Sequence, residues 1–355
     1  MLKLALIYGG KSSEHSVSCV TALGVYDAID QEKYEIIPVG ITPSGRFVLE
    51  PVNPDWELTG WPKVSEDSPE LLLPVGGGEL RMAATGMSLG KIDIAFPVLH
   101  GLNGEDGSIQ GLLQLCKIPY VGNGVLASAL AMNKAIAKST FRDAGIPVAR
   151  DLVISRADWQ TSREQVLKDA AKFLSPSCFV KPSRSGSSVG VTKAHNLLEL
   201  ESGIEEALGH DNTALVEEQV IGREIECSVL EHPGGQLQVS LAGEIVVDGD
   251  GFYDYQNKYL GSGAELKVPT ELSKQELLQM QQLARKAFRA AGCSGLARTD
   301  FFLTKKGLVL TEINTLPGFT PISMYPALFA ASGLGYEDLI ETLIARGLEL
   351  GDEPR

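Results

Sequence analysis

The sequence predicts an α/β protein that becomes α+β in its C-terminal part. Three observations support this class. Short apolar runs alternate with helical patterns through the first third of the chain, 44% of the residues are hydrophobic, and long strand-like runs with a hairpin fill the last third. The chain has 355 residues, and at roughly 100–200 residues per domain this length favours two or three domains.

The elements of the first third predict a parallel sheet with helices on both faces. Strands are expected at 3–8, 35–41, 91–101 and 118–122, and helices at 14–29 and within 104–116. Ligands of such sheets lie beyond the carboxyl ends of the strands, where the segments 9–14 and 100–107 are placed. Residues 42–90 form a polar excursion rich in proline and glycine, to which the sequence assigns no function.

The pattern changes near Gly124, where a helix is expected over 127–144 before Gly145-Ile146-Pro147 ends it. Strands and helices then alternate to about residue 226. The C-terminal part predicts long strands at 222–232 and 237–247, an aromatic-polar loop at 251–263, a helix at 273–291, a hairpin and a final helix. These changes divide the chain into three domains at 1–124, 125–220 and 221–355.

Composition excludes several classes of function. A net charge of −14 argues against non-specific binding of nucleic acid, because phosphate backbones require a basic face. The five cysteines form no CxxC pair, which indicates reduced thiols and a cytoplasmic protein. The apolar N-terminus MLKLALIYGG predicts a buried strand rather than a signal peptide, and no apolar run approaches the ~20 residues that span a membrane.

The strongest cluster of chemistry-bearing residues lies in a predicted hairpin over 294–318. With Lys305-Lys306-Gly307 as a three-residue loop, the expected cross-strand pairs are Thr304 with Leu308, Phe302 with Leu310, Asp300 with Glu312, and Arg298 with Asn314. The register would slip by one if the loop were longer. One face then presents Arg298, Asp300, Glu312 and Asn314, with Phe302 and Leu310 beyond them.

Two opposed carboxylates repel each other, and Arg298 is the one cation that this face supplies. Oxygen ligands of this kind suit Mg²⁺, which keeps waters and shares its coordination with nucleotide phosphates. The alternative is a polar outer face of the sheet. The apolar flanks of the hairpin and the rigid Asn-Thr-Leu-Pro-Gly that follows favour the metal site.

The segment KPSRSGSSVG (181–190) follows a short strand and has three possible roles. It could be a solvated turn, a flexible linker, or a cradle in which backbone N–H groups, hydroxyls and a lysine bind phosphate. Beside a magnesium site, the third role points to ATP. Lys134 and Lys258 could also reach phosphates, although each alone is more often a surface lysine.

Five segments, KPSRSGSSVG, VEEQVIGREIECSVL, FYDYQNKY, RTDFFL and EINTLPGFT, occur in the order and at the spacing of the ATP-grasp ligases. With GGKSSEHSVS and HGLNGEDGSIQG, the chain resembles the D-alanine–D-alanine ligase family over essentially its whole length. The resemblance implies an ATP-grasp fold with an N-terminal parallel-sheet domain of the pre-ATP-grasp type. It implies a substrate-binding domain at 1–124, a central subdomain with a phosphate lid at 125–220, and a C-terminal subdomain with the magnesium site at 221–355.

The resemblance also implies a nucleotide site, with ATP between two antiparallel sheets. Its implied ATP contacts are Lys134, Lys181, Gly186, Ser188, Val189, Glu217, Glu218, Gln219, Val220, Glu224, Lys258 and Phe302. Among these, Lys134 and Lys181 meet the phosphates, the backbone of the segment 217–220 reads the adenine edge, Glu224 binds ribose and Phe302 packs on adenine. Two Mg²⁺ ions, with Mn²⁺ as a substitute, are expected on Asp300, Glu312 and Asn314.

For the amino-acid substrates, the resemblance implies two groups of residues. The catalytic group is Glu14, Ser187, Tyr259, Arg298 and Gly318, and the substrate-binding group is Val17, His100, Ser323 and Met324. Glu14 is expected to hold the first D-alanine ammonium, and Ser323 and Met324 the second carboxylate. Arg298 and the Gly318 N–H are expected to stabilise the oxyanion. His100 is either a substrate contact or a neutral structural histidine.

The implied reaction joins two D-alanine molecules through an acyl phosphate, for peptidoglycan precursor synthesis by a cytoplasmic homodimer without a nucleic-acid or membrane partner. A D-alanine–D-lactate or D-alanine–D-serine ligase is the alternative, although the loop FYDYQNKY has the tyrosine of the dipeptide-forming type. A non-catalytic nucleotide-binding module is a more distant alternative. It would be expected to lack a metal ligand or Arg298, and both are present.

Overall fold

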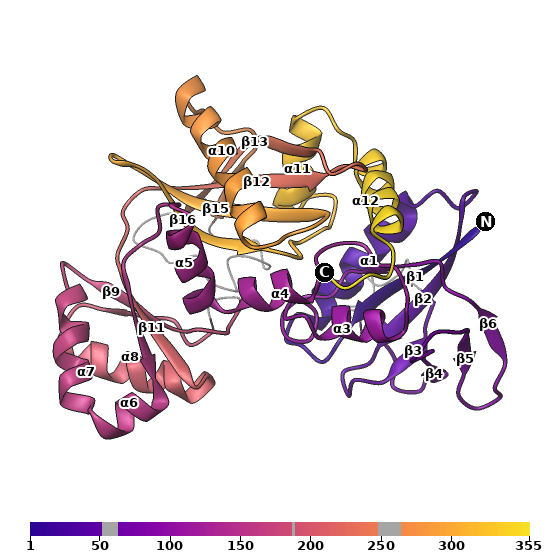
Figure 1. Cartoon of the computed structure of the whole chain (residues 1–355), viewed down its shortest axis with the longest axis horizontal. Coiled ribbons are helices and arrows are strands. Elements are labelled where there is room, and N and C mark those ends of the chain that lie inside the picture. Colours follow the sequence, from indigo (N-terminus) through magenta and orange to yellow (C-terminus); the bar gives the residue numbers. More distant parts are fainter. Residues whose placement is uncertain (52–62, 187–188, 248–263) are drawn as a thin grey trace.

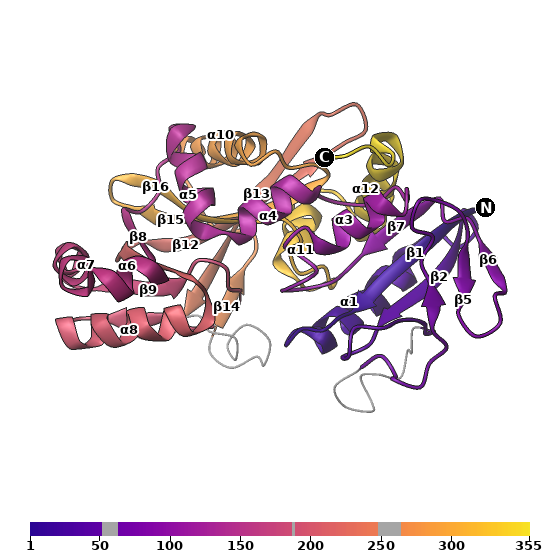
Figure 2. The ribbon, with the colours of Figure 1, turned by 60° about the horizontal axis from the view of Figure 1, so that its bottom comes forward.

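The computed structural model describes residues 1–51, 63–186, 189–247 and 264–355, and it confirms the mixed α/β class. The described strands form a four-stranded N-terminal sheet, a small three-stranded sheet beside it, a four-stranded central sheet and a five-stranded C-terminal sheet. Figures 1 and 2 show the N-terminal sheet at one end of the molecule, the central sheet at the other, and the C-terminal sheet between them.

The N-terminal sheet has the order β3-β2-β1-β7, in which β1 is parallel to both β2 and β7 and β3 is an antiparallel edge. The elements of this part of the chain are β1 (Leu2–Gly9), α1 (His15–Ala28), β2 (Tyr34–Ile41), β3 (Phe47–Leu49), β4 (Leu71–Leu72), β5 (Leu80–Met82), β6 (Ser88–Gly90), β7 (Ile94–Pro97) and α3 (Ser108–Leu115). The expected strand at 118–122 is only a bridge between Ala95 and Tyr120. The polar excursion supplies β3 and the small sheet β4-β5-β6.

Alternate residues of β1 enter two different cores. Leu4, Leu6 and Tyr8 pack with α1 and with the C-terminal helix α12 (Tyr336–Leu350), whereas Ala5 and Ile7 pack with α3. Helices therefore cover both faces of the sheet, as predicted. One of these faces is completed by the last helix of the chain, which the sequence order alone did not indicate.

Helical residues after Gly124 form two helices rather than the single helix expected. They are α4 (Val125–Met132) and α5 (Lys134–Asp143). Asn133 separates them: its extended backbone interrupts α4, and its side chain accepts a hydrogen bond from the N–H of Ile136 at 3.2 Å, which caps α5.

The central sheet has the order β10-β9-β11-β8 and is antiparallel throughout. Its elements are β8 (Asp151–Ser155), α6 (Arg156–Thr161), α7 (Arg163–Ala170), a 3₁₀ turn (Ala171–Phe173), β9 (Cys178–Pro182), β10 (Thr192–Ala194), α8 (Leu197–His210) and β11 (Thr213–Glu218). The helix α8 buries one side against β9 and β11 through Leu200, Ile204 and Ala207. The opposite face of the sheet is left for the side chains of the site.

The C-terminal sheet is also antiparallel, in the order β14-β13-β12-β15-β16. Its elements are β12 (Arg223–Glu231), β13 (Leu237–Val247), β14 (Ala264–Lys267), α10 (Lys274–Ala290), β15 (Leu296–Thr304), β16 (Gly307–Asn314) and α11 (Met324–Ala331). The helix α10 packs Met280, Ala284 and Phe288 on one face of this sheet. No helix among the residues that the structure describes is both long and apolar enough to cross a bilayer.

The predicted hairpin forms, but part of its register differs. Thr304 pairs with Gly307, so the loop has two residues, and near the loop Phe302 lies opposite Val309 instead of Leu310. The expected pairs Thr304–Leu308 and Phe302–Leu310 are therefore wrong. A β-bulge at Thr311, whose hydroxyl donates to the carbonyl of Asp300 at 2.8 Å, restores the register beyond it. The functional pairs Asp300–Glu312 and Arg298–Asn314 are confirmed.

The junction after the N-terminal sheet is held by Asn123, a buried side chain that makes three hydrogen bonds. Its Nδ2 donates to the carbonyls of Leu296 at 2.6 Å and Thr315 at 2.7 Å, and its Oδ1 accepts from the N–H of Ser294 at 2.9 Å. These partners flank the strands β15 and β16. Asn123 therefore connects the N-terminal part of the chain to the hairpin.

Replacing Asn123 by alanine is expected to lower the free energy of unfolding by about 3 kcal/mol, because each buried backbone group left without a partner costs roughly 1–3 kcal/mol. Urea denaturation followed by circular dichroism measures the change. Asn212→Ala, which removes an exposed amide that accepts from Arg156, is the control and should change stability by less than about 1 kcal/mol. Equal midpoints for both variants would contradict the role given to Asn123.

Candidate active site

One side of the site is a cluster of three lysines around one glutamate. Lys134 and Lys138 lie one turn apart on α5, Lys181 lies on β9, and Glu217 lies on β11. The register pairs Lys181 with Leu215, so Glu217 is its diagonal neighbour on the same face of the central sheet. The start of α5 is attached to the end of β9, because the N–H of Lys134 donates to the carbonyl of Ser183 at 2.9 Å.

The Glu217 carboxylate is shared between two of these lysines. Its Oε1 pairs with Nζ of Lys138 and its Oε2 with Nζ of Lys181. Burial would raise the pKa of Glu217, but the two ammonium groups lower it to about 2. Burial lowers the pKa of Lys138, whereas for Lys181 the effect of burial is outweighed by Glu217 and its pKa is raised. The carboxylate is therefore ionised throughout the physiological range.

This pKa predicts a pH dependence of stability. Because the folded-state pKa of Glu217 lies below the usual 4.5, its contribution is complete above pH 4.5 and is lost as the pH falls towards 2. The difference in free energy of unfolding between the unmodified chain and Glu217→Gln should shrink by about 3 kcal/mol over this interval. Denaturation midpoints across the interval measure it. Parallel curves would contradict the assignment.

The other side of the site is a polar face of the C-terminal sheet. Across β12, β15 and β16, the register places Glu226, Asp300 and Glu312 in one row. The neighbouring row contains Arg298 and Asn314. Arg298 donates to both carboxylate oxygens of Asp300 at 2.7 Å, and its Nε lies 2.9 Å from Oε2 of Glu226.

These charges are buried and strongly coupled. Arg298, Asp300 and Glu226 are each less than a tenth exposed. Burial opposes the charge on Arg298, but Asp300 and Glu226 outweigh it and raise the pKa of the guanidinium well above its ordinary value. Arg298 is therefore a permanent cation held in a fixed orientation, among more carboxylates than it can neutralise.

The two sides lie within electrostatic reach of each other. Burial lowers the pKa of Lys134, and Glu312 of the C-terminal sheet acts against this shift. Glu312 likewise acts to raise the pKa of Lys181. Figure 1 shows α5 between the central sheet and β16. A basic side and an acidic side therefore face each other, an arrangement suited to a phosphate group bridged by cations.

The acidic side offers the donor set that magnesium prefers. Its possible ligands are the carboxylate oxygens of Asp300 and Glu312 and the amide oxygen of Asn314. These side chains come from adjacent positions of β15 and β16. Within the described ranges, no three His, Cys, Asp or Glu side chains converge on one point. Two carboxylates and one amide therefore fit a cation that keeps waters and binds phosphate oxygens, rather than one held by the protein alone.

The loops at the carboxyl ends of β1 and β7 meet, as predicted. Glu14 is buried at the start of α1, and a Cβ built on Gly101 would lie only 2.9 Å from its Oε2, so the two loops approach closely. The φ of +72° at Gly101 favours glycine there. His100 is buried, and its Nε2 lies 3.3 Å from the hydroxyl of Thr21. That hydroxyl donates to the carbonyl of Val17, which is half-buried on α1. His100 thus has a structural partner, and a substrate role for it stays a prediction.

The start of α11 lies near Gly318. A Cβ on Gly318 would lie 3.2 Å from the hydroxyl oxygen of Ser323, which accepts from the N–H of Thr320 at 3.1 Å. Met324 begins α11, but its side chain packs with Ile245 and Leu328. Its backbone N–H at the helix N-terminus is therefore the part that suits a carboxylate.

The remaining predicted nucleotide residues lie near the ends of strands of the two sheets or in the segments beside them. Phe302 and Glu224 are register partners on β15 and β12. The Glu218 carboxylate accepts from Nε of Arg150 at 2.7 Å, and the Gln219 side chain accepts from the hydroxyl of Ser177 at 2.6 Å. The nucleotide-binding roles of Val220, Gly186 and the exposed Val189 stay predictions. The predictions for Ser187, Ser188, Lys258 and Tyr259 lie outside the described residues.

Family models match both ends of the chain. A model described as the D-Ala D-Ala ligase N-terminus matches residues 3–123, and one described as the C-terminus matches residues 140–345. The chain belongs to the D-alanine–D-alanine ligase family. The D-alanine–D-alanine ligase of Mycobacterium sp. (strain KMS) is 45% identical over 367 residues, covering 98% of each chain. That of Mycolicibacterium smegmatis is 45% identical over 369 residues, covering 98% of this chain and 97% of the relative.

Solved structures of the same family share the fold. The D-alanine–D-alanine ligase from Coxiella burnetii is 32% identical with a TM-score of 0.82, covering 99% of this chain and 96% of that one. The VanG D-Ala:D-Ser ligase from Enterococcus faecalis is 35% identical with a TM-score of 0.85, covering 98% and 99%. These relatives have the ATP-grasp fold, so the predicted fold is confirmed.

Two charged residues of this site, Glu226 and Lys138, were not predicted from the sequence. Glu226 alternates with apolar residues in REIECSVL, and this period-two pattern on a strand next to β15 could have placed it beside Asp300. Lys138 follows Lys134 by one helical turn, and this spacing could have placed both on one face of α5.

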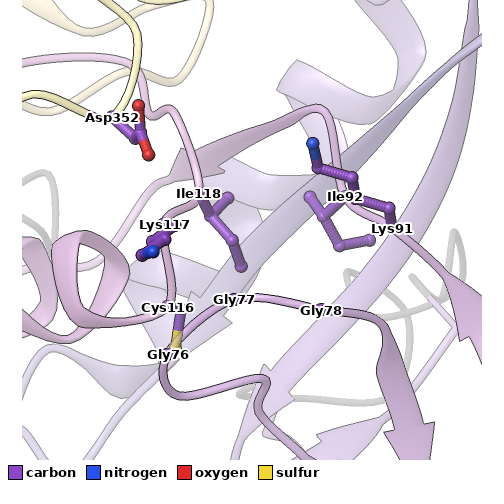
Figure 3. Close-up of a pocket in the computed structure, with 9 residues that line it drawn as sticks. All are labelled: Gly76, Gly77, Gly78, Lys91, Ile92, Cys116, Lys117, Ile118 and Asp352. Atoms are coloured by element: carbon purple, nitrogen blue, oxygen red, sulfur yellow. The ribbon is translucent and has the colours of Figure 1, made fainter.

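A separate hollow of about 360 Å³ lies by the small sheet, away from this site. Figure 3 shows Gly76, Gly77 and Gly78 on one side of it, with Lys91, Lys117 and Asp352 around it. These glycines and charged residues are exposed, whereas the lining residues Ile92, Cys116 and Ile118 are buried. None of the predicted site residues lines this hollow.

Proposed function

We propose that the chain ligates two D-alanine molecules to D-alanyl-D-alanine, with ATP as co-substrate and ADP and phosphate as products. The observation that carries the proposal is the lysine cluster of the central sheet facing the Arg298 and carboxylate rows of the C-terminal sheet. The buried Glu14 provides a carboxylate for a substrate ammonium. Membership of the D-alanine–D-alanine ligase family supports the same reaction.

In the first step, the carboxylate of one D-alanine attacks the γ-phosphorus of ATP, and the bond to ADP breaks. Lys134 and Lys181 offset the negative charge of the phosphates, because they are held at the site by α5 and β9. Glu14 binds the ammonium group of this D-alanine and orients its carboxylate. Bound on Asp300, Glu312 and Asn314, Mg²⁺ would supply neutralisation of phosphate charge.

In the second step, the amine of the other D-alanine attacks the acyl carbon, phosphate leaves, and the nitrogen loses a proton. Arg298 and the Gly318 N–H stabilise the oxyanion of the tetrahedral intermediate. Ser323 and the N-terminus of α11 hold the carboxylate of this second substrate. The lid segment 181–190 excludes water from the acyl phosphate, which would otherwise hydrolyse.

The wider setting belongs to the same proposal. The product is a peptidoglycan precursor, the compartment is the cytoplasm, and the assembly is a homodimer. In the division at 1–124, 125–220 and 221–355, the first part binds the first D-alanine through Glu14, and the central part binds phosphates. The C-terminal part binds the metal and the second D-alanine. The tyrosine-containing loop at 251–263 and the identities of 45% to D-alanine–D-alanine ligases favour D-alanine over D-serine as second substrate.

The test is phosphate release from ATP and Mg²⁺ with D-alanine, L-alanine, or D-alanine plus D-serine or D-lactate, with products identified by mass. We expect release with D-alanine alone and a dipeptide product. Preferential formation of a mixed product would show that D-serine or D-lactate, and not D-alanine, is the second substrate. Absence of any D-alanine-dependent release would overturn the proposed function.

A further inference from the structure

We propose that Lys138 is a positioning residue for ATP: it shares the Glu217 carboxylate with Lys181 and so leaves the Lys181 ammonium available to phosphate. The proposal rests on the proposed function, because it concerns the binding of nucleotide phosphates. It assigns a role to a residue that lies beneath the site and that the mechanism above does not use.

Burial separates the two lysines. The side chain of Lys181 is 19% exposed, whereas that of Lys138 is 3% exposed and that of Glu217 is 8% exposed. Lys181 is therefore open to a ligand from solvent, whereas Lys138 is almost wholly covered. Any influence of Lys138 on a bound phosphate must pass through Glu217 or through space.

The three charges are arranged so that one anion serves two cations. One oxygen of Glu217 faces Lys138 and the other faces Lys181. Without Lys138, both oxygens would serve Lys181 alone, and the pair would be neutral. With Lys138 the group carries one net positive charge, and a phosphate that approaches Lys181 competes with a carboxylate whose charge is already partly offset.

Stability alone does not account for the lysine. Burial disfavours the charged form of Lys138 and lowers its pKa. A buried ion pair contributes little net stability compared with apolar residues of similar volume. A methionine would fill the same space on α5 without this cost, so the charge itself is the feature that needs a function.

The helix also connects Lys138 to the phosphate side. Lys134, four residues earlier on the same face of α5, bonds through Nζ to the carbonyl of Ser185 in the lid segment. The capping side chain of Asn133 accepts from the hydroxyl of Ser183 at 2.8 Å. Fixing Lys138 to the central sheet through Glu217 therefore also fixes the helix that presents Lys134.

The experiment compares Mg²⁺–ATP binding by isothermal titration calorimetry for the full chain and for Lys138→Met, Glu217→Gln and the double variant. Lys138→Met should raise the Kd about tenfold, equivalent to about 1.4 kcal/mol. The double variant should recover to within about threefold of the unmodified chain, because removing Glu217 releases Lys181. Steady-state assays of Lys138→Met should show a raised KM for ATP with a smaller change in kcat.

Arg163→Met is the matched control. Arg163 also pairs with two glutamates, Glu201 and Glu205, but on the outer helices of the central domain, and ATP affinity should not change. Normal ATP affinity in Lys138→Met would overturn the proposal. So would a double variant that binds as weakly as Lys138→Met, since the defect would then not depend on Glu217. Absence of ATP binding by the unmodified chain would instead overturn the proposed function.

Discussion

Replacing Arg298 by methionine is expected to lower kcat about 1,000-fold, the upper range for removal of one group that stabilises an oxyanion. Arg298 is buried, and its guanidinium is held by Asp300 and Glu226 in one orientation. No reorganisation is then required as charge develops on the acyl oxygen. The variant also leaves Glu226, Asp300 and Glu312 with less compensation, so its stability should fall.

The step that fails identifies the role of Arg298. Consumption of ATP that depends on D-alanine should persist at a reduced rate in Arg298→Met, while dipeptide per ATP falls, since the acyl phosphate forms but is hydrolysed. Arg298→Lys keeps the charge without the bidentate geometry, and it should fold better and remain at least about tenfold slower. A dipeptide yield per ATP equal to that of the unmodified chain in both variants would contradict a role in the second step.

The hairpin illustrates which parts of the fold could be predicted from sequence. Counting from an assumed three-residue loop placed Asp300 opposite Glu312 and Arg298 opposite Asn314 correctly. Two errors cancelled: the loop has two residues, and Thr311 inserts an extra residue as a bulge. Alternation of side chains cannot reveal either, because a bulge depends on tertiary hydrogen bonds such as that from Thr311 to Asp300.

The charged network was only partly predictable for a related reason. Motif resemblance predicted Lys134, Lys181 and Glu217 as nucleotide contacts, and the structure brings these three together with Lys138. Lys138 follows Lys134 by one helical turn, but a lysine on a helix is usually solvated, so this spacing does not predict its burial. Only its pairing with Glu217 of β11 distinguishes it, and this contact joins segments far apart in the sequence.

Contributions from distant segments also limited the prediction of domains. The core on one face of the N-terminal sheet contains Tyr8 from β1 together with Tyr325 and Ile344 from the last two helices. The sequence order places those helices beside the C-terminal sheet. A boundary drawn along the chain cannot express a core that both ends of the chain share.

Replacing Lys181 by methionine is expected to lower kcat/KM for ATP about 1,000-fold. Lys181 is the most exposed member of the trio with Lys138 and Glu217, and Glu312 of the opposite sheet acts on its pKa. In the proposed reaction it offsets phosphate charge, both in the bound state and during transfer. Both KM for ATP and kcat should change, whereas KM for D-alanine should change little.

The variant should still fold, because Glu217 keeps Lys138 as its partner. Lys193→Met is the matched control: it removes an exposed lysine from β10, on the neighbouring strand, whose Nζ lies 5.9 Å from the ring centre of Phe179. Steady-state kinetics with varied ATP at saturating D-alanine measure the effect, and circular dichroism checks the fold. A loss shared equally by both lysine variants would assign the effect to the general positive potential of this sheet rather than to contact between Lys181 and phosphate.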